Sequence, residues 1–274
     1  MLNRININDD RKVADVNVQT PKWYRLSDVS LPPAHVGSAL AYNAKDQTVL
    51  LIGGSSSSAD YNKDFWLFNG NKWEKRTTYN KLAARTGMSL TWDDIRMRVV
   101  LFGGMEYGKY VGDTWLFNGV EWGQIYPPSA PSPRAYASLT YDAKRDISVL
   151  FGGFSENGQR FPEALNELWR WDGENWEHQA LVNLPSPRFG ASMVFDKAHG
   201  TILLFGGGSG GCILGDTWVY DGDQWKEKMP SSSPPPRAYF GMAYHEKWQQ
   251  VVLFGGQSYN GIVADTWVWD GKDW

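Results

Sequence analysis

The 274-residue chain has little of several features that mark common classes of protein. Its single cysteine, Cys212, excludes an internal disulfide framework. Its 27 Lys and Arg residues are outnumbered by 30 Asp and Glu residues, so it offers no broad positive field to attract nucleic acid or an acidic membrane surface. It has no apolar run of about 18 residues, the length that a membrane-spanning helix needs. We therefore expect neither nucleic-acid binding nor membrane insertion.

The first ten residues, MLNRININDD, lack the basic start, apolar segment and cleavage site of a secretory signal. The sequence as written therefore predicts a cytoplasmic protein. A chain with one cysteine is compatible with either redox compartment, so an extracellular location stays open if the sequence is a fragment of a longer protein.

Aromatic residues and glycine are abundant: the chain has 15 Trp, 13 Tyr, 12 Phe and 29 Gly, together with 14 Pro. Large flat side chains mixed with turn-forming residues favour many short strands over helices. The composition predicts an all-β protein.

Tryptophans recur with a period near 50 residues, which is typical of an array of supersecondary units. The recurring residues are Trp23, Trp73, Trp122, Trp176, Trp225 and Trp274. They divide the chain into an N-terminal segment, residues 1–22, and five repeats over 23–73, 73–122, 122–176, 176–225 and 225–274.

Each repeat has the pattern of four strands. In the third repeat these are residues 137–142 (ASLTYD), 147–153 (ISVLFGG), 167–171 (ELWRW) and 175–179 (NWEHQ). An Asx-Gly pair joins the third strand to the fourth in every repeat, which predicts tight two-residue hairpins. The pairs are Asn69-Gly70, Asn118-Gly119, Asp172-Gly173, Asp221-Gly222 and Asp270-Gly271.

The second strand of each repeat is apolar at consecutive positions, as in residues 98–104 (RVVLFGG). Both of its faces must then be covered, which a lone four-stranded meander cannot do. Sheets stacked face to face around an axis cover both faces, with aromatic side chains between them. The sequence therefore predicts a β-propeller with one four-stranded blade per repeat.

The Gly-Gly pair after the second strand, the acidic residue two positions before a tryptophan, and the 50-residue period resemble kelch repeats over residues 23–274. The form D-T-W-x-[FWY]-[DN]-G-x-x-W is similar to kelch variants common in bacterial proteins. The resemblance implies a kelch-type propeller. It constrains function weakly, because kelch propellers serve as adaptors, scaffolds and a few enzymes.

The closure of the ring has two interpretations. Residues 13–26 (VADVNVQTPKWYRL) resemble residues 263–274 (VADTWVWDGKDW) at both ends. In a five-bladed ring, which we favour because five complete repeats are present, residues 23–26 supply the fourth strand of the last blade. In a six-bladed ring, residues 13–26 form two strands of a blade whose other strands belong to a longer protein.

A basic residue precedes the first strand of each repeat, and an acid opens each third strand, on the same expected face of the ring. The basic residues are His35, Arg85, Arg134, Arg188 and Arg237, and the acids are Asp64, Asp113, Glu167, Asp216 and Asp265. One interpretation is a ligand-binding ring of guanidinium groups around the channel mouth. The other is a set of ion pairs that fix the blades. In kelch adaptors that bind acidic peptides, arginines at the matching place contact carboxylates, so the resemblance implies a ligand that carries carboxylates.

The segments between the second and third strands vary from repeat to repeat, as expected of a scaffold that presents variable contacts. They contain several tyrosines and phenylalanines, whose rings are well suited to ligand contacts. We predict that Tyr61, Tyr107, Tyr110 and Tyr259 bind ligand, and we note Phe154 and Phe161 in the same segments. The alternative is that these rings fold over their own blades.

The favoured function is a non-catalytic binding module or scaffold that recognises a protein segment or a glycan, preferably one that carries carboxylates. The alternative is a carbohydrate-active enzyme that resembles the sialic-acid epimerase-like kelch proteins. In that case Arg134, Arg188 and Arg237 would hold an acidic sugar, and Glu106, Glu156 or Glu163 would transfer protons. A third possibility is a scaffold that binds through its blade edges.

No catalytic residue, metal site or cofactor is predicted. The four histidines fall on different parts of the expected propeller, and Cys212 has no histidine near it in sequence. The oligomeric state cannot be derived from the sequence.

Overall fold

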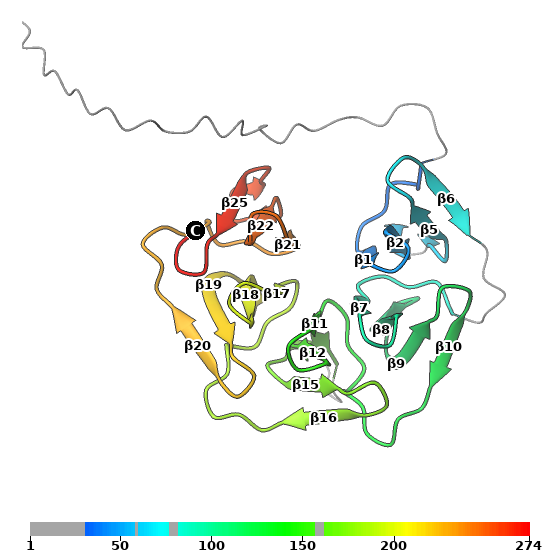
Figure 1. Cartoon of the computed structure of the whole chain (residues 1–274), viewed down its shortest axis with the longest axis horizontal. Coiled ribbons are helices and arrows are strands. Elements are labelled where there is room, and N and C mark those ends of the chain that lie inside the picture. Colours follow the sequence, from blue (N-terminus) through cyan, green and yellow to red (C-terminus); the bar gives the residue numbers. More distant parts are fainter. Residues whose placement is uncertain (1–30, 58–59, 77–81, 157–161) are drawn as a thin grey trace, which may run out of the picture.

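The computed structural model describes residues 31–57, 60–76, 82–156 and 162–274, and these form β-sheets arranged as blades around a central channel (Figure 1). The all-β propeller architecture expected from the sequence is thereby confirmed. The described residues contain no helix long and apolar enough to cross a membrane.

The first four blades are antiparallel four-stranded sheets, one per repeat. Blade 1 comprises β1 (Ala39–Asn43), β2 (Thr48–Ile52), β5 (Phe65–Phe68) and β6 (Trp73–Arg76). Blade 2 comprises β7 (Ser89–Asp93), β8 (Arg98–Glu106), β9 (Lys109–Phe117) and β10 (Trp122–Ile125). Blade 3 comprises β11 (Ser138–Asp142), β12 (Ile147–Phe151), β15 (Leu168–Trp171) and β16 (Trp176–Gln179). Blade 4 comprises β17 (Ser192–Asp196), β18 (Thr201–Ser209), β19 (Cys212–Tyr220) and β20 (Trp225–Lys228).

Blade 5 has three strands among the described residues: β21 (Gly241–His245), β22 (Gln250–Phe254) and β25 (Thr266–Trp269). Trp274 lies where the fourth strand of the other blades begins. Its indole Nε1 donates to Thr217 Oγ1 of blade 4 at 3.0 Å, as Trp176 Nε1 donates to Thr114 Oγ1 of blade 2 at 2.9 Å. Trp274 therefore fills the same site between blades as its counterpart in the third repeat.

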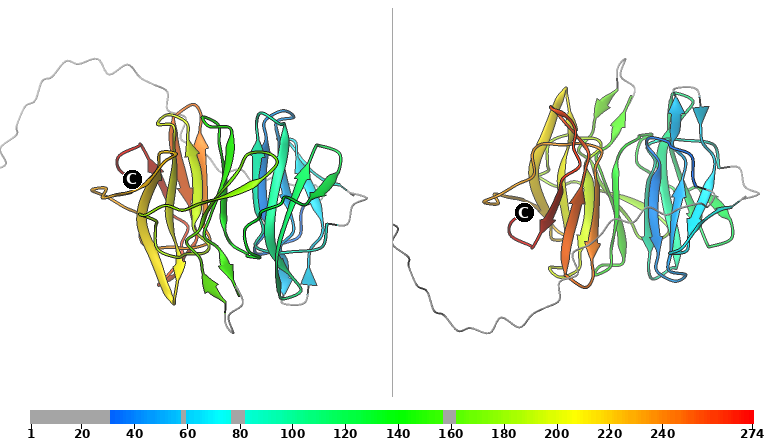
Figure 2. Two further views of the ribbon diagram at one scale, coloured as in Figure 1. Left: turned by 90° about the horizontal axis from the view of Figure 1, so that it is seen from below. Right: turned by 90° about the horizontal axis from the view of Figure 1, so that it is seen from above.

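The variable segments between the second and third strands are hairpins. In blades 2 and 4 the long strands β8–β9 and β18–β19 continue past the Gly-Gly pair, while the other blades carry small two-stranded sheets. These are β3 (Ser55–Ser57) with β4 (Asp60–Tyr61), β13 (Phe154–Ser155) with β14 (Glu163–Ala164), and β23 (Gln257–Ser258) with β24 (Gly261–Ile262). The hairpins β3–β4 and β13–β14 extend from the same side of the propeller (Figure 2).

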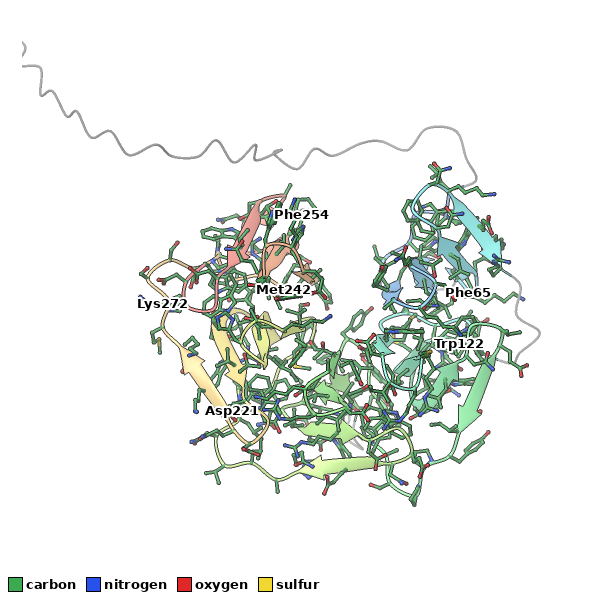
Figure 3. All side chains as sticks on the ribbon, viewed as in Figure 1. Phe65, Trp122, Asp221, Met242, Phe254 and Lys272 are labelled. Carbon is green, nitrogen blue, oxygen red and sulfur yellow. The ribbon has the colours of Figure 1, made fainter. Side chains whose placement is uncertain are left out.

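The core lies between neighbouring blades. The second strands are buried, with Val99, Leu150 and Leu203 fully inaccessible to solvent, as their unbroken apolar pattern predicts. The closing tryptophan of one blade packs on an aromatic ring of the blade before it. Phe65 and Trp122 show this at the boundary of blades 1 and 2, with ring centroids 6.5 Å apart (Figure 3).

The prediction of two-residue hairpins at the Asx-Gly pairs is wrong. Trp171 pairs with Trp176, so residues 172–175 form a four-residue connection, and its backbone conformation also differs from that of a two-residue hairpin. Only the glycine has a positive φ, for example 107° at Gly173, and the preceding Asx residue does not. Instead the Asp172 carboxylate accepts hydrogen bonds from the backbone N–H groups of Glu174 and Asn175 at 2.8 and 2.7 Å. The aspartate thus caps the turn through its side chain.

The blades form an arc that is open between blade 5 and blade 1 in the described part of the chain (Figure 1). The first strands β1, β7, β11, β17 and β21 pack successively against one another, and no such packing joins β21 to β1. Both predicted ways of closing the ring use residues 13–26, and these lie outside the described residues. The choice between five and six blades therefore stays a prediction.

Candidate binding site at the channel mouth

The start of each first strand and the beginning of each hairpin meet on one face of the propeller. Antiparallel bridges join the two segments in all five repeats, for example Ala135 to Phe154 and Phe189 to Gly208. The basic residues before the first strands therefore lie beside the hairpin bases, as the sequence indicated.

The four arginines at these positions are buried, with 1% or less of their surface exposed. Arg188 makes two hydrogen bonds to the Asp216 carboxylate at 2.8 and 2.7 Å, and Arg237 does the same with Asp265 at 2.6 and 2.8 Å. Arg85 pairs with Asp113 and also with Glu106, and Arg134 pairs with Glu167.

The remaining guanidinium donors are also occupied. In Arg188, Nη1 donates to the Gly206 carbonyl at 3.0 Å, and Nε donates to the Ser186 carbonyl at 2.9 Å. The same two bonds recur in the other three arginines, to the first glycine of the Gly-Gly pair and to the residue two positions before the arginine. This geometry favours the ion-pair interpretation of the arginine series, and contact with a ligand stays a prediction.

The acid in each unit is shared with the tryptophan two residues later. The Trp218 indole donates to Asp216 at 2.7 Å, and the Trp267 indole donates to Asp265 at 2.7 Å. Burial alone would raise the pKa of Asp216, but the hydrogen bonds and the charge of Arg188 outweigh burial and lower it. The hydrogen bond from Arg237 is the main cause that lowers the pKa of Asp265. The D-x-W motif is thus a structural unit that holds the arginine.

Blade 1 departs from this pattern. His35 is partly exposed, and its Nδ1 lies 3.0 Å from the Pro33 carbonyl oxygen. Asp64 pairs instead with Lys75 at 2.7 Å, and the Trp66 indole Nε1 is buried without a hydrogen-bond partner in the described part of the chain. The predicted ring of five basic residues is therefore four buried arginines and a separate histidine.

An open series of main-chain hydrogen bonds runs along the channel mouth from blade 1 to blade 5. Five residues, each two positions after the basic residue, are linked in sequence by N–H···O=C bonds of 2.7 to 2.9 Å: Gly37, Gly87, Tyr136, Gly190 and Tyr239. Tyr136 and Tyr239 both have a φ of 56°, which is uncommon for residues other than glycine. The two tyrosines are thereby turned toward the mouth of the channel.

A cavity of 640 Å³ occupies this mouth. It is lined by main chain and small residues from all five blades, with Met88, Tyr136, Tyr239, Phe240 and Gln257 as the larger side chains. The rings of Tyr136 and Tyr239 meet edge to face, 5.4 Å apart. Burial raises the pKa of Tyr239 to about 12, so its hydroxyl group is neutral at physiological pH and can donate a hydrogen bond.

Tyr136 and Tyr239 are not among the binding residues predicted from the sequence. The signal was present, because the position two residues after the basic residue is glycine in three repeats and tyrosine in two. A large aromatic side chain at a position that is glycine in the other repeats indicates a surface that differs between repeats.

Several predicted tyrosines form contacts between neighbouring hairpins. The Tyr61 hydroxyl accepts a hydrogen bond from the Gly108 N–H at 3.1 Å, and its ring lies 5.3 Å from that of Tyr107. The Tyr259 hydroxyl accepts from the Ile213 N–H at 2.6 Å. Tyr110 lies beside Phe154, with ring centroids 6.4 Å apart. Their ligand contacts stay predictions, and Phe161 lies outside the described residues.

The acids named for an enzymatic alternative do not gather in the mouth cavity. Glu106 pairs with buried Arg85, while Glu156 and Glu163 are exposed, and the cavity lining includes none of the three. Within the described ranges, no group of three His, Cys, Asp or Glu residues could hold a metal ion. Cys212 is exposed at the start of β19.

The repeated arginine–carboxylate–tryptophan unit, the Gly-Gly strand ends and the blade arrangement together define a kelch-repeat β-propeller. A family model described as the KLHDC2/KLHL20/DRC7 Kelch-repeats domain matches residues 4–181. The chain belongs to this kelch-repeat family. A search of curated proteins found no match.

Proposed function

We propose that this kelch propeller is a non-catalytic binding module whose channel mouth takes one side chain of an extended protein segment. The observation that carries the proposal is the 640 Å³ cavity lined by Tyr136, Tyr239 and Phe240 on the face from which the variable hairpins extend. Concave sites with aromatic walls and a few polar groups are typical of ligand recognition. Kelch propellers commonly serve protein interaction, which agrees with this use of the fold.

The lining favours an apolar or aromatic side chain with a hydrogen-bonding group over a carboxylate. Arg134, Arg188 and Arg237 donate to protein acceptors, are almost inaccessible to solvent and do not line the cavity. An acidic group in the cavity would therefore lose hydration without gaining a cation as partner. Tyr239, with 49% of its surface exposed, offers both a ring face and a hydroxyl donor.

The proposal is tested by selecting binders from a random peptide library displayed on phage and measuring the affinity of each selected peptide for variant proteins. Tyr136→Ala and Tyr239→Ala should each weaken binding by at least about tenfold, which corresponds to ~1.4 kcal/mol. The control is Tyr126→Ala, which removes an 82% exposed tyrosine that directly follows the outer strand β10.

Equal binding of the selected peptides to all three variants would contradict the proposal. Failure to select any peptide, together with binding on a glycan array that Tyr239→Ala abolishes, would instead identify the mouth as a carbohydrate site. Peptides that bind but are lost only in variants of the outer strands would point to a scaffold that uses its blade edges.

A further inference from the structure

The opposite face of the propeller carries a second set of contacts between blades. In blades 2, 3 and 4, the turn between the first and second strands places a basic side chain against the Asx-Gly turn of the following blade. Arg96 lies over Gly173, Arg145 lies over Gly222, and His199 lies over Gly271.

Each of these basic side chains is anchored by a buried acid three residues earlier. Arg145 pairs with Asp142 at 2.6 Å, and His199 Nδ1 lies 2.8 Å from the Asp196 carboxylate. Arg145 also donates to the Asp221 carbonyl of the next blade. The guanidinium or imidazole group thus closes the outer end of each boundary between blades.

The boundary of blades 1 and 2 lacks this side chain. At the equivalent positions the chain has Asn43 in place of the buried acid and Asp46 in place of the basic residue. Asn43 Nδ2 donates to Asp46 Oδ2 at 3.0 Å, so the Asp46 carboxylate is held by its own turn and does not extend over the facing blade as the basic side chains do elsewhere. No side chain of the described residues covers Gly119, the glycine of the facing turn.

A cavity of 450 Å³ lies at this boundary. Its walls are apolar, formed by Leu50, Phe65, Leu67 and Phe117, and its rim carries polar groups that include Asp46 and Thr48. Thr48 Oγ1 is buried and has no hydrogen-bond partner among the residues that the structure describes. Buried hydroxyl groups without a partner are uncommon in proteins and mark a site where a polar partner would be stabilising.

The charges around the cavity are consistent with a cationic ligand. Arg76 lines the rim, but its guanidinium is bound to Glu74 at 2.9 Å and its side chain is 54% exposed. Lys45 belongs to the exposed turn and does not line the cavity. Asp46 is therefore the acidic side chain of the rim that has no basic side chain bound to it among the described residues.

We propose that this cavity between blades 1 and 2 binds a guanidinium group on an aliphatic stem, taking the role that Arg96 and Arg145 have at the next two boundaries. The stem would lie along Phe65 and Phe117, and the guanidinium would donate to the Asp46 carboxylate and to Thr48 Oγ1. The planar donor fork suits a carboxylate, and the apolar walls suit the methylene groups. The site lies on the face opposite the channel mouth and does not depend on the function proposed there.

The test is a titration of the isotope-labelled whole chain with butylguanidinium and with an acetylated, amidated Gly-Arg-Gly tripeptide, followed by the amide NMR signals of Thr48, Gly119 and Val120. We expect saturable shifts with a Kd of about 1 mM. Asp46→Arg, which supplies the missing side chain, should weaken binding at least tenfold. Asp94→Arg, which makes the same charge change in the matching turn of blade 2, should leave binding unchanged.

The two probes distinguish the source of the ligand: binding of both or of the tripeptide alone supports an arginine from a protein, and binding of butylguanidinium alone supports a small molecule. A second measurement is the midpoint of thermal unfolding, which Asp46→Arg should raise relative to Asp94→Arg because it closes the boundary. If Asp46→Arg does not fold, Asp46→Asn replaces it in the titration. Absence of shifts at about 10 mM of either probe, or shifts that Asp46→Arg leaves intact, would overturn the proposal.

Discussion

At the scale of residues, the repeated unit is an arginine held by a carboxylate that also accepts a tryptophan N–H. The unit ties together the start of the first strand, the end of the second and the start of the third. A buried ion pair of this kind is weakly stabilising as a whole, but removal of one partner leaves a buried charge unpaired. The sequence predicted that each arginine faces an acid. It could not choose between ligand binding and ion pairing, because that depends on burial.

Arg188→Ala should lower the free energy of unfolding by roughly 3 to 5 kcal/mol, because Asp216 then remains largely buried without its partner. Urea denaturation of the variant beside the wild type measures this loss. The double variant Arg188→Met with Asp216→Leu should recover much of it, since both charges are removed together. A loss below about 0.5 kcal/mol in Arg188→Ala would mean that the guanidinium is free to bind ligand.

The same ion pairs predict loss of stability in acid. The pKa values of Asp216 and Asp265 are lowered in the folded protein relative to an unfolded value of about 3.9. Their contribution is therefore complete above that value and is lost as the pH falls through the folded pKa values. The urea midpoint should fall between about pH 4 and pH 2.

Asp265→Asn is the variant that tests this assignment. It should be less stable than the wild type at neutral pH and should lose less stability on acidification. Asp223→Asn, which changes an exposed acid in the neighbouring turn of blade 4, should keep the wild-type slope. An equal acid slope in Asp265→Asn and the wild type would show that other carboxylates govern acid unfolding.

At the scale of elements, the buried second strand and the glycine that ends it set the geometry of a blade. The four-strand pattern of each repeat and the positions of the Asx-Gly turns could be read from the sequence, because apolar runs and turn residues act locally. The hairpins beyond the Gly-Gly pair could not. Segments such as residues 105–112 (MEYGKYVG) have no strong alternation, and they pair because the strands below already hold them together.

Gly206→Ala should destabilise the protein more than Gly210→Ala. Both glycines have a positive φ, 60° and 54°, so both variants carry similar backbone strain of about 1 kcal/mol. A Cβ atom on Gly206 would in addition lie 2.5 Å from the Arg237 carbonyl oxygen, whereas nothing lies within 4 Å at Gly210. Urea midpoints compare the two, and equal losses would show that the blade boundary yields to the added methyl group.

At the scale of the whole molecule, the blades form an array in which each contacts its neighbours through the faces of its strands. The number of blades in the sequence was predicted from the period of the tryptophans. The mouth cavity was not predicted. Its walls come from residues about 50 positions apart in the sequence, and only the arrangement of the blades brings these residues together. Tyr136 and Tyr239 illustrate this, because neither is unusual within its own repeat.

Backbone amide exchange should be slowest in the middle of the array. Among the described residues, blades 2, 3 and 4 each pack against two neighbouring blades, while blades 1 and 5 each pack against one. Stability in repeat arrays is approximately a sum over neighbouring interfaces, so β12 should be better protected than β2 and β22. Hydrogen exchange followed by mass spectrometry measures this gradient. Uniform protection of all five second strands would show that the array opens as one unit.

The most direct test of the account is hydrogen exchange of the protein with and without the tightest peptide selected on it. If the mouth is the binding site, peptide segments that contain residues 36–38, 136–137 and 239–240 should exchange more slowly in the complex. The outer strands β10, β16 and β20 should be unchanged. Protection confined to those outer strands, with the mouth unaffected, would contradict the account and place binding at the edges of the blades.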